Sequence, residues 1–157
     1  MLANLYNEKK DVIQALQTER QLLSITQDET ILKRMQRRFE YFFITSQNPI
    51  NRIVVYNECK ELMPTGIRGV QIKERLLHDF ITLDLLDKAY DLAMELTQTT
   101  AEQKQQPSAL YAYLIANILK DTEKQNLAKE YLADDWKKQK LPDNTPEILK
   151  WIYRRIR

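Results

Sequence analysis

The chain has 157 residues, of which 43% are hydrophobic and 29% are charged, with two glycines, one cysteine and a formal net charge of +2. This length suits one domain built around a single core. Nucleotide-binding glycine loops and the nucleophile elbow of hydrolases need several glycines at fixed spacing, so a sequence with only Gly66 and Gly69 excludes them. The lone Cys59 excludes an internal disulfide and a cysteine-cluster zinc site, and we expect it to be a small core residue.

The first third of the chain has helical periodicity. A broken apolar stripe predicts a leading helix over residues 1–25. Thr26, followed three residues later by Glu29, predicts a capping box at the start of a second helix. This helix ends before Pro49, because proline disfavours the α conformation of the residue that precedes it. Its predicted buried face consists of Leu32, Met35, Phe39 and Phe42.

Three further helices are predicted in the middle of the chain. Residues 50–62 are predicted to be helical, and a strand is the alternative for the β-branched run Ile53–Val55. Residues 69–82 form the next helix, and Leu85–Thr97 forms another. The polar segment Thr97–Pro107 is predicted to be the longest linker and a mobile loop.

The last third of the chain has the same apolar periodicity. Ser108–Leu119 and residues 121–138 are predicted to be helices. Thr145 then provides an N-cap hydroxyl and Pro146 a proline at the first helical position, which together predict the start of a C-terminal helix over residues 145–157.

These elements predict one all-α domain over residues 1–157. About seven helices with short connections favour antiparallel neighbours, because a short loop returns the chain beside the helix that it has left. About three helix pairs occupy residues 29–140, between the leading helix and the C-terminal helix. Such a stack of pairs is an α-solenoid, and an irregular helical bundle is the alternative.

Two of the predicted pairs contain a weak internal repeat. Their second helices place Ala89 and Ala128 at equivalent positions, where a small residue lets two helices approach closely, and the separation lies within the roughly 34 to 47 residues of helix-pair repeats. In these features the chain resembles the tetratricopeptide and pentatricopeptide superfamily of helical repeats. The best match is Leu110–Asn144, with Leu114–Ile115 in its first helix and Pro142–Asp143 at its close. The preceding unit keeps Leu76, Phe80, Ala89 and Ala93.

The resemblance implies an α-solenoid whose concave surface binds a partner. Pentatricopeptide repeats read RNA bases with polar side chains of the first helix and of the repeat's end. Asn144 fits the second role. The first helix offers Tyr113 or Leu114, and Leu114 cannot hydrogen-bond a base edge. This departure argues against sequence-specific reading of RNA and leaves non-specific contact with RNA open.

Signals for catalysis are weak. The only histidine, His78, lies one helical turn after Glu74, but a metal site in a helical bundle needs several glutamates and histidines on facing helices. Ser24 and Ser108 are predicted to lie in loops or caps, so the sequence suggests no serine nucleophile with a histidine base. We predict that the protein is not an enzyme and has no cofactor and no metal site.

Basic residues close to aromatic residues are the candidate binding residues. Cations suit phosphates and aromatic rings suit stacked bases, although cations near a helix C-terminus also complement the helix dipole. The candidates for contact with a partner or with RNA are Lys33, Arg34, Arg37, Arg38, Tyr41, Tyr113, Trp136, Lys137, Lys138, Lys140, Arg154 and Arg155.

We therefore expect a non-catalytic protein–protein interaction or scaffold module that is a subunit or domain of a larger assembly. An RNA-associated helical-repeat protein and the ligand-sensing helical domain of a regulator are the alternatives. The sequence contains no apolar run long enough to span a membrane and no secretory signal near Met1. The expected partner is another protein, with RNA as the alternative, and the expected location is intracellular, in the cytoplasm or in an organellar matrix.

Overall fold

The computed structural model describes residues 2–99 and 107–157, and in these residues it contains eight α-helices, two short 3₁₀ helices and no strand. Neighbouring helices pack in pairs, which confirms the all-α fold. Each of the eight helices corresponds to one of the helical segments predicted above, so the predicted total of about seven is one too low. The chain divides into two compact units, the first ending at Ile72 and the second beginning at Lys73. The single domain and the solenoid arrangement stay predictions.

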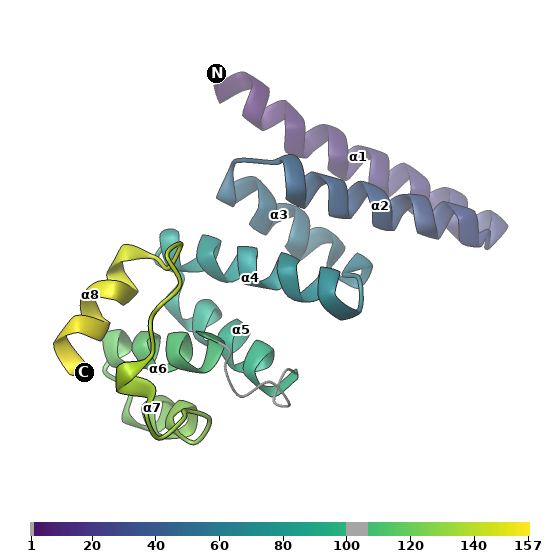
Figure 1. The fold of residues 1–157 in the computed structure, drawn as a ribbon. Helices are drawn as coiled ribbons and strands as arrows, with labels where there is room; N and C mark the ends of the chain where they lie inside the picture. The colour runs from purple at the N-terminus through teal and green to yellow at the C-terminus, as the bar shows by residue number, and fades with distance from the viewer. Residues whose placement is uncertain (1, 100–106) are drawn as a thin grey trace. The chain divides into compact units, whose positions relative to one another are not determined.

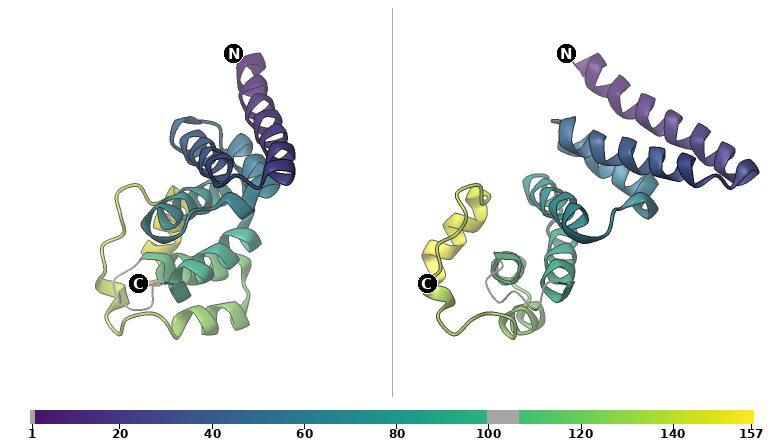
Figure 2. Two further views of the ribbon diagram at one scale, coloured as in Figure 1. Left: turned by 90° about the vertical axis from the view of Figure 1, so that its right-hand side faces the viewer. Right: turned by 45° about the vertical axis from the view of Figure 1, so that its right-hand side comes forward.

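The first unit contains three long helices, α1 (Leu2–Thr26), α2 (Glu29–Thr45) and α3 (Pro49–Cys59), followed by the 3₁₀ helix η1 (Lys60–Leu62). α1 and α2 lie side by side, and both contact α3 (Figures 1 and 2). Apolar side chains from these elements form the core of the unit, as the helical spacing predicts. The most deeply buried are Leu16, Met35, Phe39, Phe43, Val55, Cys59 and Leu62.

The predicted buried face of α2 is correct except at its first residue. Met35, Phe39 and Phe42 are buried, whereas Leu32 is exposed and Ile31 is buried in its place. The burial of Cys59 confirms that it is a core residue. The strand alternative for Ile53–Val55 is wrong, because Asn48 caps a helix that begins at Pro49 and continues through these residues.

The predicted capping box is also wrong. α1 continues through Thr26, whose hydroxyl donates to the Leu22 carbonyl oxygen. Gln27 then takes a positive φ of 51°, and Asp28 becomes the cap of α2, because its carboxylate accepts a hydrogen bond from the Thr30 backbone N–H at 2.8 Å. The helix boundary therefore lies two residues later than the predicted cap.

Both glycines lie where the chain enters α4 (Gly66–Thr82), which starts three residues before the predicted position. Gly66 has a φ of 70°, in the left-handed region that favours glycine. Gly69 lies against the preceding turn, since a Cβ atom at this position would stand 2.1 Å from the Pro64 carbonyl oxygen. The sequence of this turn thus needs two glycines for two different reasons.

The second unit contains the rest of α4 together with α5 (Leu86–Thr99), α6 (Pro107–Leu119), α7 (Thr122–Lys129), the 3₁₀ helix η2 (Trp136–Lys138) and α8 (Glu147–Ile156). α6 is its central helix, because it packs against α5, α7 and α8. Most of its residues are buried accordingly, as the strongly apolar sequence predicts.

Two predictions around the start of α6 need correction. Thr97–Thr99 belong to α5 and Pro107 begins α6, so the predicted linker is helical at both ends, and its residues 100–106 lie outside the described part of the chain. Ser108 is not a loop or cap residue but is buried within α6, where its hydroxyl accepts a hydrogen bond from Thr97 at 3.1 Å. Ser24 likewise lies within α1.

The helix predicted over residues 121–138 stops at Lys129. The chain leaves it through a tightened turn, in which the Tyr131 and Leu132 amides bond to carbonyl oxygens three residues earlier. Trp136 then enters the core from η2. The apolar spacing up to Trp136 is helical, but Asp134 and Asp135 have low helix propensity and the burial of the indole decides the path of the chain.

The last helix begins later than predicted. α8 starts at Glu147 with Pro146 as its cap residue, and no side chain caps it. The hydroxyl of Thr145, which the sequence places at the cap, is instead buried and paired with a tyrosine hydroxyl of α6.

Candidate functional site

The basic candidate residues of α2 fall into two groups according to their contacts. These residues are Lys33, Arg34, Arg37 and Arg38. The Arg34 Nε atom lies 2.7 Å from Glu19 Oε1, and the Arg38 guanidinium lies 3.1 Å from the same oxygen. Glu19 belongs to α1, and its carboxylate is buried. Both arginines therefore join α2 to α1 by charge-assisted hydrogen bonds.

The other two basic residues share one side of α2 with two neighbouring residues. We call these four residues the outer face of α2, which consists of Lys33, Arg37, Tyr41 and Ile44. The spacing of three and four residues places these side chains on one side of the helix. All four are exposed, Tyr41 at 68% and Ile44 at 69% of its surface. Within the described residues, neither Lys33 nor Arg37 forms an ion pair. The outer face thus combines two exposed apolar side chains with two cations.

The aromatic candidates of the second unit pack together. Trp136 is 8% exposed, with its ring 5.2 Å from that of Tyr113 and 6.2 Å from that of Tyr153. Lys137 places its Nζ atom 5.7 Å from the Trp136 ring centre. Trp136 and Tyr113 thus join η2 to α6 and α8. The Trp136 ring leaves little surface open to a ligand and Tyr113 is half-buried, while Lys137 and Lys138 are exposed.

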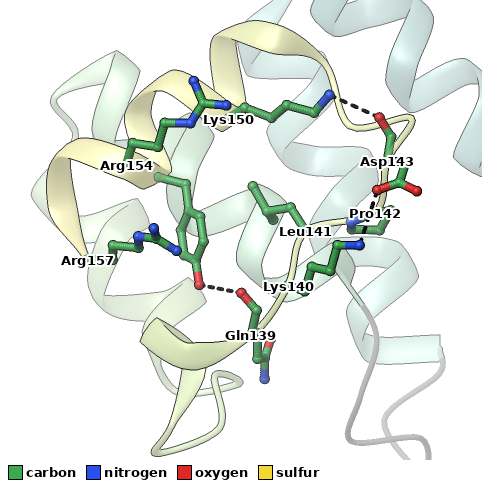
Figure 3. Close-up of a pocket in the computed structure, with 9 residues that line it drawn as sticks. Gln139, Lys140, Leu141, Pro142, Asp143, Lys150, Arg154 and Arg157 are labelled. Carbon is green, nitrogen blue, oxygen red and sulfur yellow. Dashed lines mark hydrogen bonds and ion pairs between the residues drawn. The ribbon is translucent and has the colours of Figure 1, made fainter.

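A basic pocket of about 260 Å³ lies between α8 and the segment that precedes it (Figure 3). Gln139–Asp143 form one side, and α8 contributes the other. The residues that line it are Gln139, Lys140, Leu141, Pro142, Asp143, Lys150, Tyr153, Arg154 and Arg157. Four of these side chains are cations and one is a carboxylate.

The cations of α8 reach the pocket because of their spacing. Lys150, Arg154 and Arg157 follow one another at steps of four and three residues, which places them on one side of the helix. Lys150 donates to the Asp143 backbone carbonyl at 3.0 Å (Figure 3). It also donates to the Glu147 carboxylate at 2.8 Å. Arg157 lies over the Tyr153 ring at 5.5 Å. Neither Lys150 nor Arg157 is among the candidates predicted from the sequence, although their spacing from Arg154 is visible there.

Two tyrosine hydroxyls fix the segment that forms the wall of the pocket. Tyr153 donates to the Gln139 carbonyl oxygen at 2.6 Å and also lies 3.0 Å from the Trp136 carbonyl oxygen. At the other end, the Tyr111 hydroxyl lies 2.6 Å from that of Thr145. Both ends of the segment are therefore attached to helices, so the wall is held in place before any ligand arrives.

Arg155 does not line the basic pocket and packs on Trp151 of the same helix instead. Its guanidinium lies 4.7 Å from the Trp151 ring centre, within the range of a cation–π interaction. Trp151 is 50% exposed. This pair therefore presents a flat ring and a cation together, next to but separate from the residues that line the basic pocket.

The titratable residues Glu74 and His78 of α4 differ in exposure, since His78 is half-buried and Glu74 is exposed. Burial raises the pKa of Glu74 and lowers the pKa of His78. His78 packs edge-on against the Tyr111 ring at 6.1 Å, and burial raises the pKa of that tyrosine. This geometry is that of helix packing, and within the described residues no group of three or more histidines, cysteines, aspartates or glutamates is placed to hold a metal ion.

Comparison with models of known protein families, with curated proteins and with solved structures finds no match to this chain. Across residues 2–99 and 107–157, no helix has both the length and the apolar character needed to cross a membrane. The fold therefore defines the class, an all-α protein of paired helices, and the sites above carry the functional argument.

Proposed function

We propose that the protein is a non-catalytic interaction module that binds another protein through the outer face of α2, as part of a larger intracellular assembly. The observation that supports this proposal is the exposure of Tyr41 and Ile44 side by side on that face. Large apolar side chains grouped on a surface are typical of binding sites, and tyrosine is enriched among the residues that contribute most to binding.

The chemistry of the outer face favours an acidic partner. Lys33 and Arg37 flank the apolar pair and form no ion pair within the described residues, whereas Arg34 and Arg38 are paired with Glu19. A partner with an apolar centre and acidic flanks would complement this pattern, and the charges would increase the rate of association. Burial of Ala89 and Ala128 agrees with the resemblance to helical repeats, whose members act by binding.

Affinity capture from the source cell tests the proposal. The wild-type chain is compared with the double variant Tyr41→Ser and Ile44→Ser, each with and without nuclease treatment. Ile67→Ser is the matched control, because Ile67 is 78% exposed but lies on α4, outside the outer face. We expect a protein partner that survives nuclease treatment, is lost with the double variant and is retained by the control. A partner retained by the double variant would contradict the proposal.

Binding of RNA is the second candidate function, and the pair of Trp151 and Arg155 favours it. An exposed indole can stack on a base while the guanidinium contacts a phosphate. Titration of single-stranded RNA at several salt concentrations tests this candidate, because binding to phosphates weakens steeply with salt. Salt-sensitive binding that Trp151→Ala reduces would support it, and the absence of binding at low ionic strength would exclude it.

A further inference from the structure

We propose that the basic pocket between Gln139–Asp143 and α8 binds the phosphate monoester group of a small ligand. This inference does not depend on the proposed function, because it concerns the second unit and a different surface. It rests on the charge, the spacing and the fixed geometry of the residues that line the pocket.

The charge of the lining favours a dianion. Lys140, Lys150, Arg154 and Arg157 face one lining carboxylate, Asp143. The Asp143 Oδ1 atom lies 3.5 Å from the Lys140 Nζ atom. Lys150 donates to the Glu147 carboxylate and to the Asp143 backbone carbonyl oxygen. Within the described residues, neither Arg154 nor Arg157 forms an ion pair. The two guanidinium groups are thus available to an anion, and their planar forks match the oxygens of a phosphate.

The helix dipole does not account for this arrangement. Cations in the last turn of a helix complement its dipole, which explains the presence of arginines at the end of α8. The helix dipole does not determine the direction in which the arginine side chains point. Lys150 lies before the last turn and still lines the pocket, whereas Arg155 of the last turn lies over Trp151 instead. The grouping of Lys150, Arg154 and Arg157 therefore indicates a site.

The size and the surroundings of the pocket favour a small ligand over a nucleic-acid strand. Its volume of about 260 Å³ is slightly below the roughly 300–1,000 Å³ of pockets for drug-sized ligands. Leu141, Pro142 and the Tyr153 ring provide apolar surface for the carrier of the phosphate. The carboxylates of Asp143 and Glu147 stand near the lysines, where they would repel the next phosphate of a continuous backbone.

The attachment of the pocket wall at both ends lowers the entropic cost of binding a ligand. The segment that contains Lys140 and Asp143 is attached at Gln139 by Tyr153 and at Thr145 by Tyr111. A ligand therefore does not need to order this segment, and more of the interaction energy appears as affinity.

Titration of the full chain with inorganic phosphate and with glycerol 3-phosphate, at constant ionic strength, tests the proposal. Amide signals in NMR spectra and the Tm report binding, since a ligand that binds only the folded state raises the Tm. We expect saturable shifts in the amide signals of residues 139–141, 143 and 154–157. The double variant Arg154→Gln and Arg157→Gln should lose affinity by about tenfold or more, because two charge-assisted contacts are removed. The matched control, Arg155→Gln, should bind as the wild type does.

The pH and a competitor complete the test. A phosphate monoester gains its second charge near a pKa of about 6, so affinity should fall when the pH is lowered from about 7.5 to about 5.5. Shifts that never saturate, equal effects of chloride, or unchanged affinity in the double variant would overturn the proposal. Stronger competition by a single-stranded RNA without terminal phosphates than by glycerol 3-phosphate would also overturn it, because it would assign the pocket to nucleic acid. The Tm of the wild type remains decisive even where a variant folds poorly.

Discussion

The hydroxyl of Tyr111 lies 2.6 Å from the hydroxyl of Thr145, with both groups buried. This contact joins the central helix α6 to the turn before α8, across a sequence separation of 34 residues. It also explains why Thr145 does not cap α8, because its side chain is already occupied by a partner in the core. The hydroxyl that the sequence predicts as the N-cap of the last helix thus forms a tertiary contact instead.

Removing this contact should destabilise the second unit. Tyr111→Phe leaves the Thr145 hydroxyl buried without its partner, so we expect a loss of about 1–2 kcal/mol in the free energy of unfolding. Hydrogen exchange of α6 and α8 amides measures it. Tyr113→Phe is the control and should change stability by less than about 0.5 kcal/mol, since the described structure gives its hydroxyl no hydrogen bond. Equal effects of the two variants would contradict the interpretation.

The buried carboxylate of Glu19 predicts an asymmetry in stability between two kinds of variant. Removing its arginine partners should destabilise the protein more than removing the charge of Glu19 itself. Arg34→Ala combined with Arg38→Ala leaves Glu19 charged and unpaired, which should cost about 2–4 kcal/mol. Glu19→Gln removes the charge and should cost only about 1 kcal/mol, because the exposed arginines return to water.

Thermal unfolding followed by circular dichroism measures this asymmetry. Arg37→Ala is the control, since Arg37 is exposed on the outer face of α2 and should have almost no effect. If Glu19→Gln proved as damaging as the double arginine variant, the pairing would not have the role described.

The two glycines in the first turn of α4 should respond differently to alanine. Gly69→Ala brings a Cβ to 2.1 Å from the Pro64 carbonyl oxygen, so the backbone must move, and we expect a loss of about 2–3 kcal/mol. Gly66→Ala meets no atom within 4 Å and suffers only the strain of a positive φ, about 1–2 kcal/mol. Urea unfolding of both variants tests the order, and a more stable Gly69→Ala than Gly66→Ala would disprove the close approach.

The partial burial of His78 predicts a pH dependence of stability. Burial lowers the pKa of His78 below 6.5, so the unfolded chain binds this proton first as the pH falls. The free energy of unfolding should therefore decrease as the pH falls through about 6.5 toward the folded pKa. Glu74 acts in the opposite direction, because burial raises its pKa above 4.5 and its stability contribution decreases as the pH rises through that range.

The difference between the wild type and His78→Gln isolates the histidine. We expect the Tm of the variant to fall less than that of the wild type between about pH 7 and pH 5.5, with Glu74 present in both proteins. Parallel Tm curves for the two proteins would show that His78 titrates normally.

The sequence was sufficient to predict most helices, because apolar residues at steps of three and four mark a buried face. Phe39 and Met35 of α2 and Leu114 of α6 are buried as this spacing requires. The apolar spacing did not predict the helix boundaries, because tertiary contacts determine where a helix begins and ends. Trp136 continues the spacing of α7, yet its contacts with Tyr113 and Tyr153 take it out of the helix, and no local pattern reports such contacts.

The basic candidates illustrate the same difference. The sequence grouped Arg34 with Arg37, but only the structure shows that a carboxylate of α1 neutralises the first and leaves the second exposed. It also placed Arg154 and Arg155 together, although a one-residue step on a helix directs them apart, one to the pocket and the other to Trp151. Lys150 shares the side of Arg154, and the four-residue step between them is evident in the sequence alone.

The burial of Cys59 has a practical consequence for spectroscopy. Its thiol is enclosed in the first unit, and burial raises its pKa, so little reactive thiolate is present at neutral pH. Because the chain has no second cysteine, one introduced at an exposed position such as Ile67 would react first with a maleimide dye. A fluorophore or spin label could thus be attached at a chosen place without replacing the native cysteine.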